Sequence, residues 1–175
     1  MKKLAVIIIL FAAIVGIALF CGENTDMGTA NSAYLRVHIR ADSNEASAQA
    51  VKYKVRDAVV EYLTPTVAEC KTKDAAMQKI GEKLREIEKV ADGVLHANGF
   101  SYSAKASLRK EEFPTRVYED LTLEAGVYDA LILELGSGKG DNWWCVVYPP
   151  LCFTGGNGNI IYKSKIAEII RKFFD

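Results

Sequence analysis

The chain has 175 residues, with 22 basic and 22 acidic side chains and a formal net charge of zero. This balance argues against a nucleic-acid-binding protein that works through a broad basic surface. Half of the residues are hydrophobic, and one N-terminal run holds much of that content, which excludes both an intrinsically disordered chain and a polytopic membrane protein. The length suggests one domain.

The N-terminus has the layout of an export signal. Lys2 and Lys3 precede an uncharged apolar run over residues 4–20, and a polar stretch follows. Because both basic residues lie before the run, the positive-inside rule directs the remainder of the chain outward. Residues 1–21 are predicted to be a signal peptide or, if uncleaved, a membrane anchor that contacts the bilayer through residues 4–20. Cys21 also leaves open a lipoprotein.

A predicted linker, residues 22–33, leads to the first predicted strand. Apolar and polar side chains alternate over residues 34–40, and this period of two is typical of a half-buried strand. The side chains expected to face the core are Leu35, Val37 and Ile39. The opposite, polar row consists of Arg36, His38 and Arg40.

Two helices are predicted next. Asp42, with Glu45 three residues later, is expected to cap the first helix, which Pro65 would interrupt. The second helix begins near Lys73 and has apolar side chains three and four residues apart as far as Asn98, where a following glycine favours a helix end. These apolar stripes are expected to pack in the core or against each other.

The second half of the chain is predicted to be mainly β. Residues 102–109 alternate, Pro114 ends that strand, and residues 116–123 suggest another. Residues 127–135 are nearly all apolar, which indicates a central strand covered on both faces. The glycine-rich residues 136–140 are interpreted as a hairpin loop before a last strand, because they lack the spacing and the following helix of a phosphate-binding loop.

The order of elements predicts an α+β fold: a single two-layer domain with an antiparallel sheet and helices mainly on one face. Residues 34–153 are assigned to this domain. Residues 154–175 are predicted to form a glycine-rich joint and a C-terminal helix, whose apolar side consists of Ile166, Ile169, Ile170 and Phe173.

Cys145 and Cys152 are the one close pair of cysteines, and two prolines between them can supply a bend. An exported protein can use disulfides, so the pair is predicted to be either a disulfide or two buried thiols. No histidine or cysteine stands at zinc-site spacing from them, and no metal or cofactor is predicted. An envelope hydrolase that uses Cys145 or Cys152 as nucleophile with His38 as base is an alternative.

Trp143 and Trp144 are adjacent in the last predicted strand, so their side chains are expected to face opposite sides of the sheet. One of them can lie in the core. The other, if exposed, favours a protein-binding site, because tryptophan is large and rigid. A module that binds peptidoglycan by stacking tryptophan on sugar is a further alternative.

Four segments of the chain resemble the stage II sporulation protein R family. They are LRVHIRADS at residues 35–43, KVRDAV at residues 54–59, FPTR at residues 113–116 and NWWCVVYPPLCF at residues 142–153. The last segment is long and specific, and the similarity extends from about residue 34 to residue 153. Asp42 stands where the family often has asparagine.

This resemblance implies a non-catalytic signalling role in endospore formation. Members of the family are made in the forespore and exported across its inner membrane, into the space between forespore and mother cell. There they activate a membrane-embedded aspartic protease of the mother cell, which removes the pro-segment of the sigma-E precursor. The export signal agrees with this role, as does the lack of a convincing catalytic motif in the sequence.

The resemblance brings no mapped interface, so candidate partner-binding residues are chosen by their chemistry. Aromatic and arginine side chains dominate binding hot spots, and arginine can pair with receptor carboxylates through two parallel hydrogen bonds. The candidates are Trp143, Trp144, Arg116, Tyr118, Arg36, His38 and Arg40.

Overall fold

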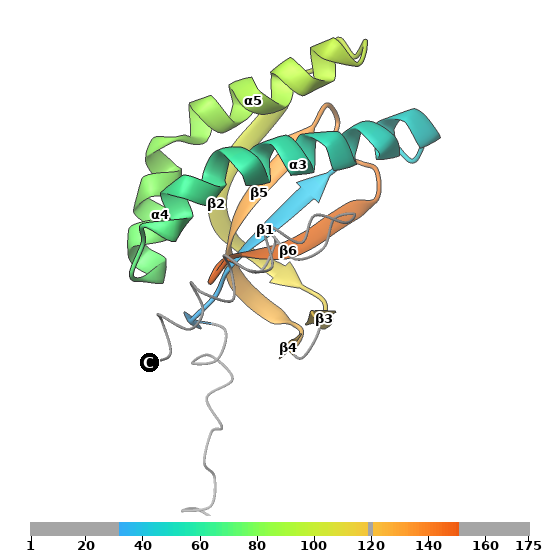
Figure 1. The fold of residues 1–175 in the computed structure, drawn as a ribbon. Helices are drawn as coiled ribbons and strands as arrows, with labels where there is room; N and C mark the ends of the chain where they lie inside the picture. The colour runs from blue at the N-terminus through green and yellow to red at the C-terminus, as the bar shows by residue number, and fades with distance from the viewer. Residues whose placement is uncertain (1–31, 119–120, 151–175) are drawn as a thin grey trace, which may run out of the picture.

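The computed structural model describes residues 32–118 and 121–150. In chain order, its elements are β1 (Leu35–Arg40), α3 (Ala46–Ala68), α4 (Lys73–Glu82), α5 (Leu84–Ala97), β2 (Ala104–Phe113), β3 (Arg116–Tyr118), β4 (Leu121–Leu123), β5 (Gly126–Leu135) and β6 (Asn142–Tyr148). The predicted α+β class is confirmed. The described helices lie on one face of the main sheet, as expected from the sequence (Figure 1).

The main sheet is mixed, with the strand order β2-β5-β1-β6. β5 pairs antiparallel with β2 but parallel with β1, and β1 pairs antiparallel with β6. The prediction of a wholly antiparallel sheet is therefore wrong. The side-chain pattern of a strand indicates which faces are buried, but not the direction of the strand beside it. The central position predicted for residues 127–135 is confirmed, because β5 lies between β1 and β2.

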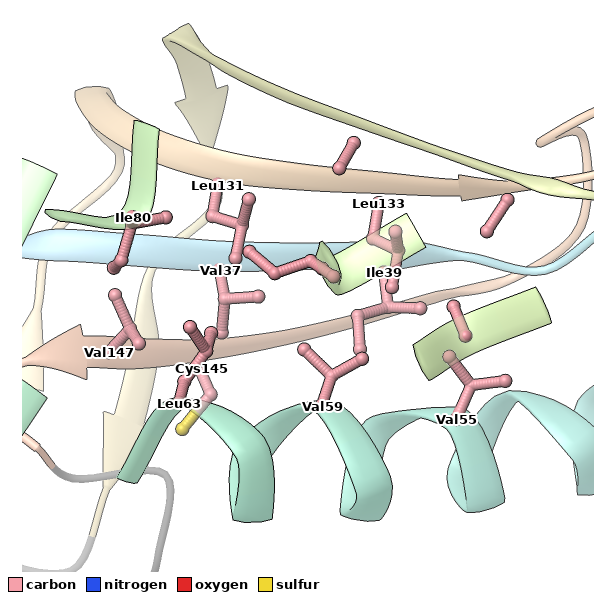
Figure 2. Close-up of a cluster of buried hydrophobic side chains, with 14 of the residues drawn as sticks. Val37, Ile39, Val55, Val59, Leu63, Ile80, Leu131, Leu133, Cys145 and Val147 are labelled. Carbon is pink, nitrogen blue, oxygen red and sulfur yellow. The ribbon is translucent and has the colours of Figure 1, made fainter. Parts of the chain in front are cut away.

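The helix-facing side of the sheet forms the main core. Val37 and Ile39 point to this side, as the alternation predicts, and they are 3% and 0% exposed. In Figure 2 these β1 side chains point toward α3, whose Val55, Val59 and Leu63 face them. Burial of apolar area contributes about 25 cal/mol per Å², so this contact holds the helical layer on the sheet.

The helices differ from their predicted outlines. α3 continues through Pro65, where the sequence predicts an interruption. Leu63 and Val67, each 1% exposed, anchor the turns on either side of this proline in the core, and this packing offsets the lost backbone hydrogen bond. The second predicted helix is divided into α4 and α5 at Lys83, whose N–H donates to Ile80 O in a tighter turn.

The glycine-rich residues 136–140 do not form the predicted hairpin loop. Their flanking strands, β5 and β6, lie on opposite sides of β1, so the loop crosses over the end of β1. Asp42 follows β1 at this point, and its carboxylate accepts a hydrogen bond from Ser137 N at 2.6 Å instead of capping α3. Gly140 N donates to Ala41 O at 2.8 Å, which fixes the loop against the same segment.

Alanine at Gly140 is expected to lower the free energy of unfolding by about 2 kcal/mol or more. The new Cβ would lie 2.5 Å from the carbonyl carbon of Ser43 and closer still to its oxygen, and this backbone cannot yield as a side chain would. The matched control is Gly93→Ala in α5, where the new Cβ meets nothing within 4 Å and alanine favours the helix. Urea unfolding compares the two variants, and an unchanged midpoint for Gly140→Ala contradicts this packing.

The edge strand β2 is protected by α5. Asp92 Oδ1 accepts from Ala104 N at 2.6 Å, and Glu88 Oε1 accepts from Ala106 N at 2.9 Å. Free edge amides can pair with a strand of another chain. The two carboxylates therefore close this part of the edge to strand addition.

The predicted export signal (residues 1–21), the C-terminal joint and helix (residues 154–175) and Cys152 lie outside the described residues. Within residues 32–118 and 121–150, no helix is both long enough and apolar enough to cross a bilayer. Export, anchoring and the C-terminal helix therefore stay predictions from the sequence.

Candidate partner-binding face

The side of the main sheet that faces away from the helices carries most of the candidate residues. The β3–β4 hairpin, a separate two-stranded sheet, lies at one end of this side (Figure 1), where the sequence predicts a single strand. We call the following set the charged–aromatic face: Arg36, His38, Arg40, Lys105, Arg109, Glu111, Phe113, Arg116, Tyr118, Tyr128, Glu134 and Trp144.

Arg36 is fully buried, with 0% of its surface exposed, and lies among aromatic rings. Its guanidinium carbon is 4.1 Å from the ring centre of Phe113 and 4.8 Å from that of Tyr128. Nη2 donates to the Tyr118 hydroxyl at 2.8 Å, whereas Nε and Nη1 have no hydrogen-bond partner in the described part of the chain. The prediction of a half-buried first strand is therefore wrong, because aromatic side chains cover its polar row.

His38 is held on three sides. Nδ1 donates to Glu111 Oε1 at 2.6 Å, and Nε2 is buried without a hydrogen-bond partner in the described segments. The ring stacks on Trp144 with centres 5.3 Å apart and meets Phe113 edge-on at 5.8 Å. Such contacts between rings contribute beyond their buried area, so His38 joins β1 to both β2 and β6.

Two glutamates join two arginines across β1, β2 and β5. Glu111 accepts from Arg40 at 2.6 Å and from Arg109 at 3.2 Å. Glu134 accepts from Arg40 at 3.0 Å and from Arg109 at 3.2 Å. Burial alone would raise the pKa of Glu111, but hydrogen bonds from His38 and Arg40 outweigh burial and hold this pKa below the ordinary value of 4.5.

This lowered pKa predicts an acid-sensitive contribution to stability. The Glu111 carboxylate stabilises the fold fully above its unfolded pKa, and the contribution is lost as the pH falls through the lower, folded pKa. Glu111→Gln is expected to lower the free energy of unfolding at neutral pH by about 2 kcal/mol and to flatten its decline in acid. Glu69→Gln, in an ion pair whose Glu69 side chain is 73% exposed, is the control and should change little. Identical pH profiles for wild type and Glu111→Gln would contradict the network.

Arg116 stacks on Trp144 at the hairpin end of the face. Its guanidinium carbon lies 4.3 Å from the centre of the tryptophan ring. Its one hydrogen bond in the described residues is a long one, to Thr115 O at 3.4 Å, and no carboxylate there lies within ion-pair distance. Both side chains are partly exposed. Together with His38 they form a layered stack that leads from the hairpin into the sheet.

Comparison with known proteins decides the family. A family model described as Stage II sporulation protein R matches residues 31–157. The chain belongs to the Stage II sporulation protein R family. The protein of that name from Bacillus subtilis (strain 168) is 33% identical over an alignment of 184 positions. This alignment covers 98% of this chain and 81% of the relative. No solved structure matches the chain. The resemblance seen in the four sequence segments is confirmed, and the chain is a sporulation protein.

In this member of the Stage II sporulation protein R family, all but one of the candidate residues lie on one face. Trp143 is the exception, because adjacent residues of a strand face opposite sides, as the sequence analysis expects. It packs against the main core, with the Arg56 guanidinium carbon 5.5 Å from its ring centre. The residues on the charged–aromatic face are Arg36, His38, Arg40, Arg116, Tyr118 and Trp144.

Three residues that organise this face of the sporulation protein are not among the partner-binding candidates chosen from the sequence. Glu111, Phe113 and Tyr128 supply the carboxylate and two of the rings around the polar row of β1. The alternation of β2 places Glu111 and Phe113 on one side of that strand, which is a usable signal. The strand order, which brings this side next to β1, is not visible in the alternation.

A hydrolase built from Cys145 and His38 does not fit this sporulation protein. Cys145 pairs with Val37 and faces the helices, where it is 6% exposed (Figure 2), whereas His38 points to the other side of the sheet. Cys152 lies outside the described residues, so its disulfide with Cys145 and its pairing with His38 are untested. In the described segments, no three His, Cys, Asp or Glu side chains are placed to hold a metal ion.

Proposed function

We propose that this chain is an exported, non-catalytic activator in endospore formation. It passes from the forespore into the space between forespore and mother-cell membranes. There it docks on a membrane-embedded aspartic protease, which then processes the sigma-E precursor. Family membership supports the sporulation role, and the order of basic, apolar and polar residues at the N-terminus supports export.

The observation that carries this proposal is the arrangement of the charged–aromatic face. Arg116 and Trp144 are partly exposed on the side of the sheet that the described helices leave open. Tryptophan and arginine are the side chains most enriched in binding hot spots, particularly where neighbouring groups hold them in place. An activating ligand must also bind the active state of its receptor more tightly than the inactive state. A fixed pair of side chains such as Arg116 and Trp144 can bind one receptor state more tightly than the other.

Direct association tests the proposal. The full chain, carrying an affinity tag, is produced with the protease in a bacterial host, and the complex is recovered from detergent-solubilised membranes. We expect the protease to co-purify with the chain. Absence of association at every concentration tested would overturn direct docking.

A further inference from the structure

The arginines of the described residues differ in whether a carboxylate neutralises them. Arg40 and Arg109 share Glu111 and Glu134, and each of the four contacts is 3.2 Å or shorter. Arg116, at the hairpin end of the same face, has no carboxylate within ion-pair distance in residues 32–118 and 121–150. Its guanidinium is nevertheless fixed in position by the Trp144 ring.

The whole charged–aromatic face has an excess of positive charge. Its basic side chains are Arg36, Arg40, Lys105, Arg109 and Arg116, and its acidic side chains are Glu111 and Glu134. Five against two gives a net charge of +3 for these residues with His38 neutral, whereas the complete chain has a net charge of zero. This set of residues is therefore more positive than the chain as a whole, and its positive charge favours a partner surface of negative charge.

Arg116 is the arginine of this face whose positive charge is most available to a partner. Arg36 is 0% exposed and lies beneath Tyr118, so it cannot meet a partner directly. Arg40 and Arg109 already have carboxylates. Arg116 is partly exposed, and its guanidinium lies over the Trp144 ring, so that a carboxylate can reach it from the solvent. Arginine on an aromatic ring loses little additional freedom when it binds a carboxylate with two parallel hydrogen bonds.

We propose that the Arg116–Trp144 pair is the anchor for an acidic segment of the partner protein. A carboxylate of that segment accepts two hydrogen bonds from Arg116, while Trp144 holds the guanidinium in place from behind. This inference rests on the proposed function, and it assigns the recognition chemistry of the docking step: a carboxylate-bearing protein surface, met at the hairpin end of the charged–aromatic face.

Binding of the purified full chain to the purified protease, both in detergent, tests the anchor. Arg116→Glu is expected to weaken binding by about 30-fold or more, because truncation of a hot spot typically costs that much. Arg116→Lys keeps the charge but not the planar fork, so its loss should be smaller. Arg85→Glu, an exposed arginine on α5, makes the same charge reversal in the helical layer and should bind as wild type does. Raising the salt concentration should weaken wild-type binding more than binding of Arg116→Ala.

A photo-crosslinking amino acid locates the contact independently of affinity. At the position of Val117, which is next to Arg116 and 67% exposed, it should capture the protease. At the position of Tyr53, which is 43% exposed on α3 in the opposite layer, it should not.

The outcomes separate the anchor from the proposed function. Wild-type binding that Arg116→Glu leaves unchanged would overturn the acidic anchor but keep the activator. Capture from Tyr53 without capture from Val117 would also overturn the anchor, because it places the contact on the helical layer. Failure of the wild-type chain to bind the protease at all would overturn the proposed function, and the anchor with it.

Discussion

Arg116→Ala is expected to abolish cleavage of the sigma-E precursor while leaving the fold intact. Arg116 contributes little to folding, because it is partly exposed and its hydrogen bond to Thr115 O is 3.4 Å long. Its stack on Trp144 adds about 1 kcal/mol at such a site. At the interface the same side chain should matter far more, since a few anchoring residues carry most of the binding energy.

Precursor cleavage is measured in a host that produces the protease, the precursor and each variant of the chain. Thermal unfolding of the purified chain measures the fold. Arg85→Ala is the matched control, because it removes an exposed arginine from the helical layer and should support normal cleavage. Normal cleavage with Arg116→Ala would contradict the assigned role. Loss of the exported protein itself would mean that Arg116 serves the fold.

The largest effect on stability is expected at Arg36. Arg36→Ala should lower the free energy of unfolding by about 3 kcal/mol, because it opens a cavity among the Phe113, Tyr118 and Tyr128 rings. Arg36→Met should cost less than half as much. Methionine keeps most of the volume and makes favourable contacts with aromatic rings. It also removes a buried charge that has no carboxylate partner in the described residues.

Urea unfolding of both variants measures this difference. The informative quantity is the difference in the free energy of unfolding between Arg36→Ala and Arg36→Met. The two substitutions remove the same charge and differ in the volume of the side chain that remains. Equal losses would contradict the account, since they would mean that the charge, rather than the packing of the side chain, holds this cluster together.

The local pattern of β1 is visible in the sequence, whereas its surroundings are not. Alternation correctly separates Val37 and Ile39 from Arg36 and His38. It predicts that the polar row meets solvent, because charged side chains are rarely buried alone. The rings that cover the row come from β2, β3, β5 and β6, so its burial depends on how these strands are arranged around β1, which a single strand cannot reveal.

The same limit explains the other differences. Between the parallel strands β1 and β5, the chain passes through the helical layer and β2 before it returns to the sheet. The residue pattern of neither strand predicts that they lie side by side. The helix continues through Pro65 because Leu63 and Val67 are buried on both sides of it, which is a tertiary effect that outweighs local propensity. The candidate residues are chosen for their chemistry, which does not depend on register; six of the seven lie on one face, and their binding to a partner stays a prediction.

The most direct test of the proposed function is reconstitution in a non-sporulating bacterial host. The host produces the protease and the sigma-E precursor, together with the full chain or a chain that lacks residues 1–21, and precursor cleavage is followed. We expect cleavage with the exported chain and none with the leaderless chain, because the proposed activator meets the protease outside the membrane that the chain crosses. Absence of cleavage with a chain that is both folded and exported would contradict the activator role, and equal cleavage with the leaderless chain would contradict action from outside.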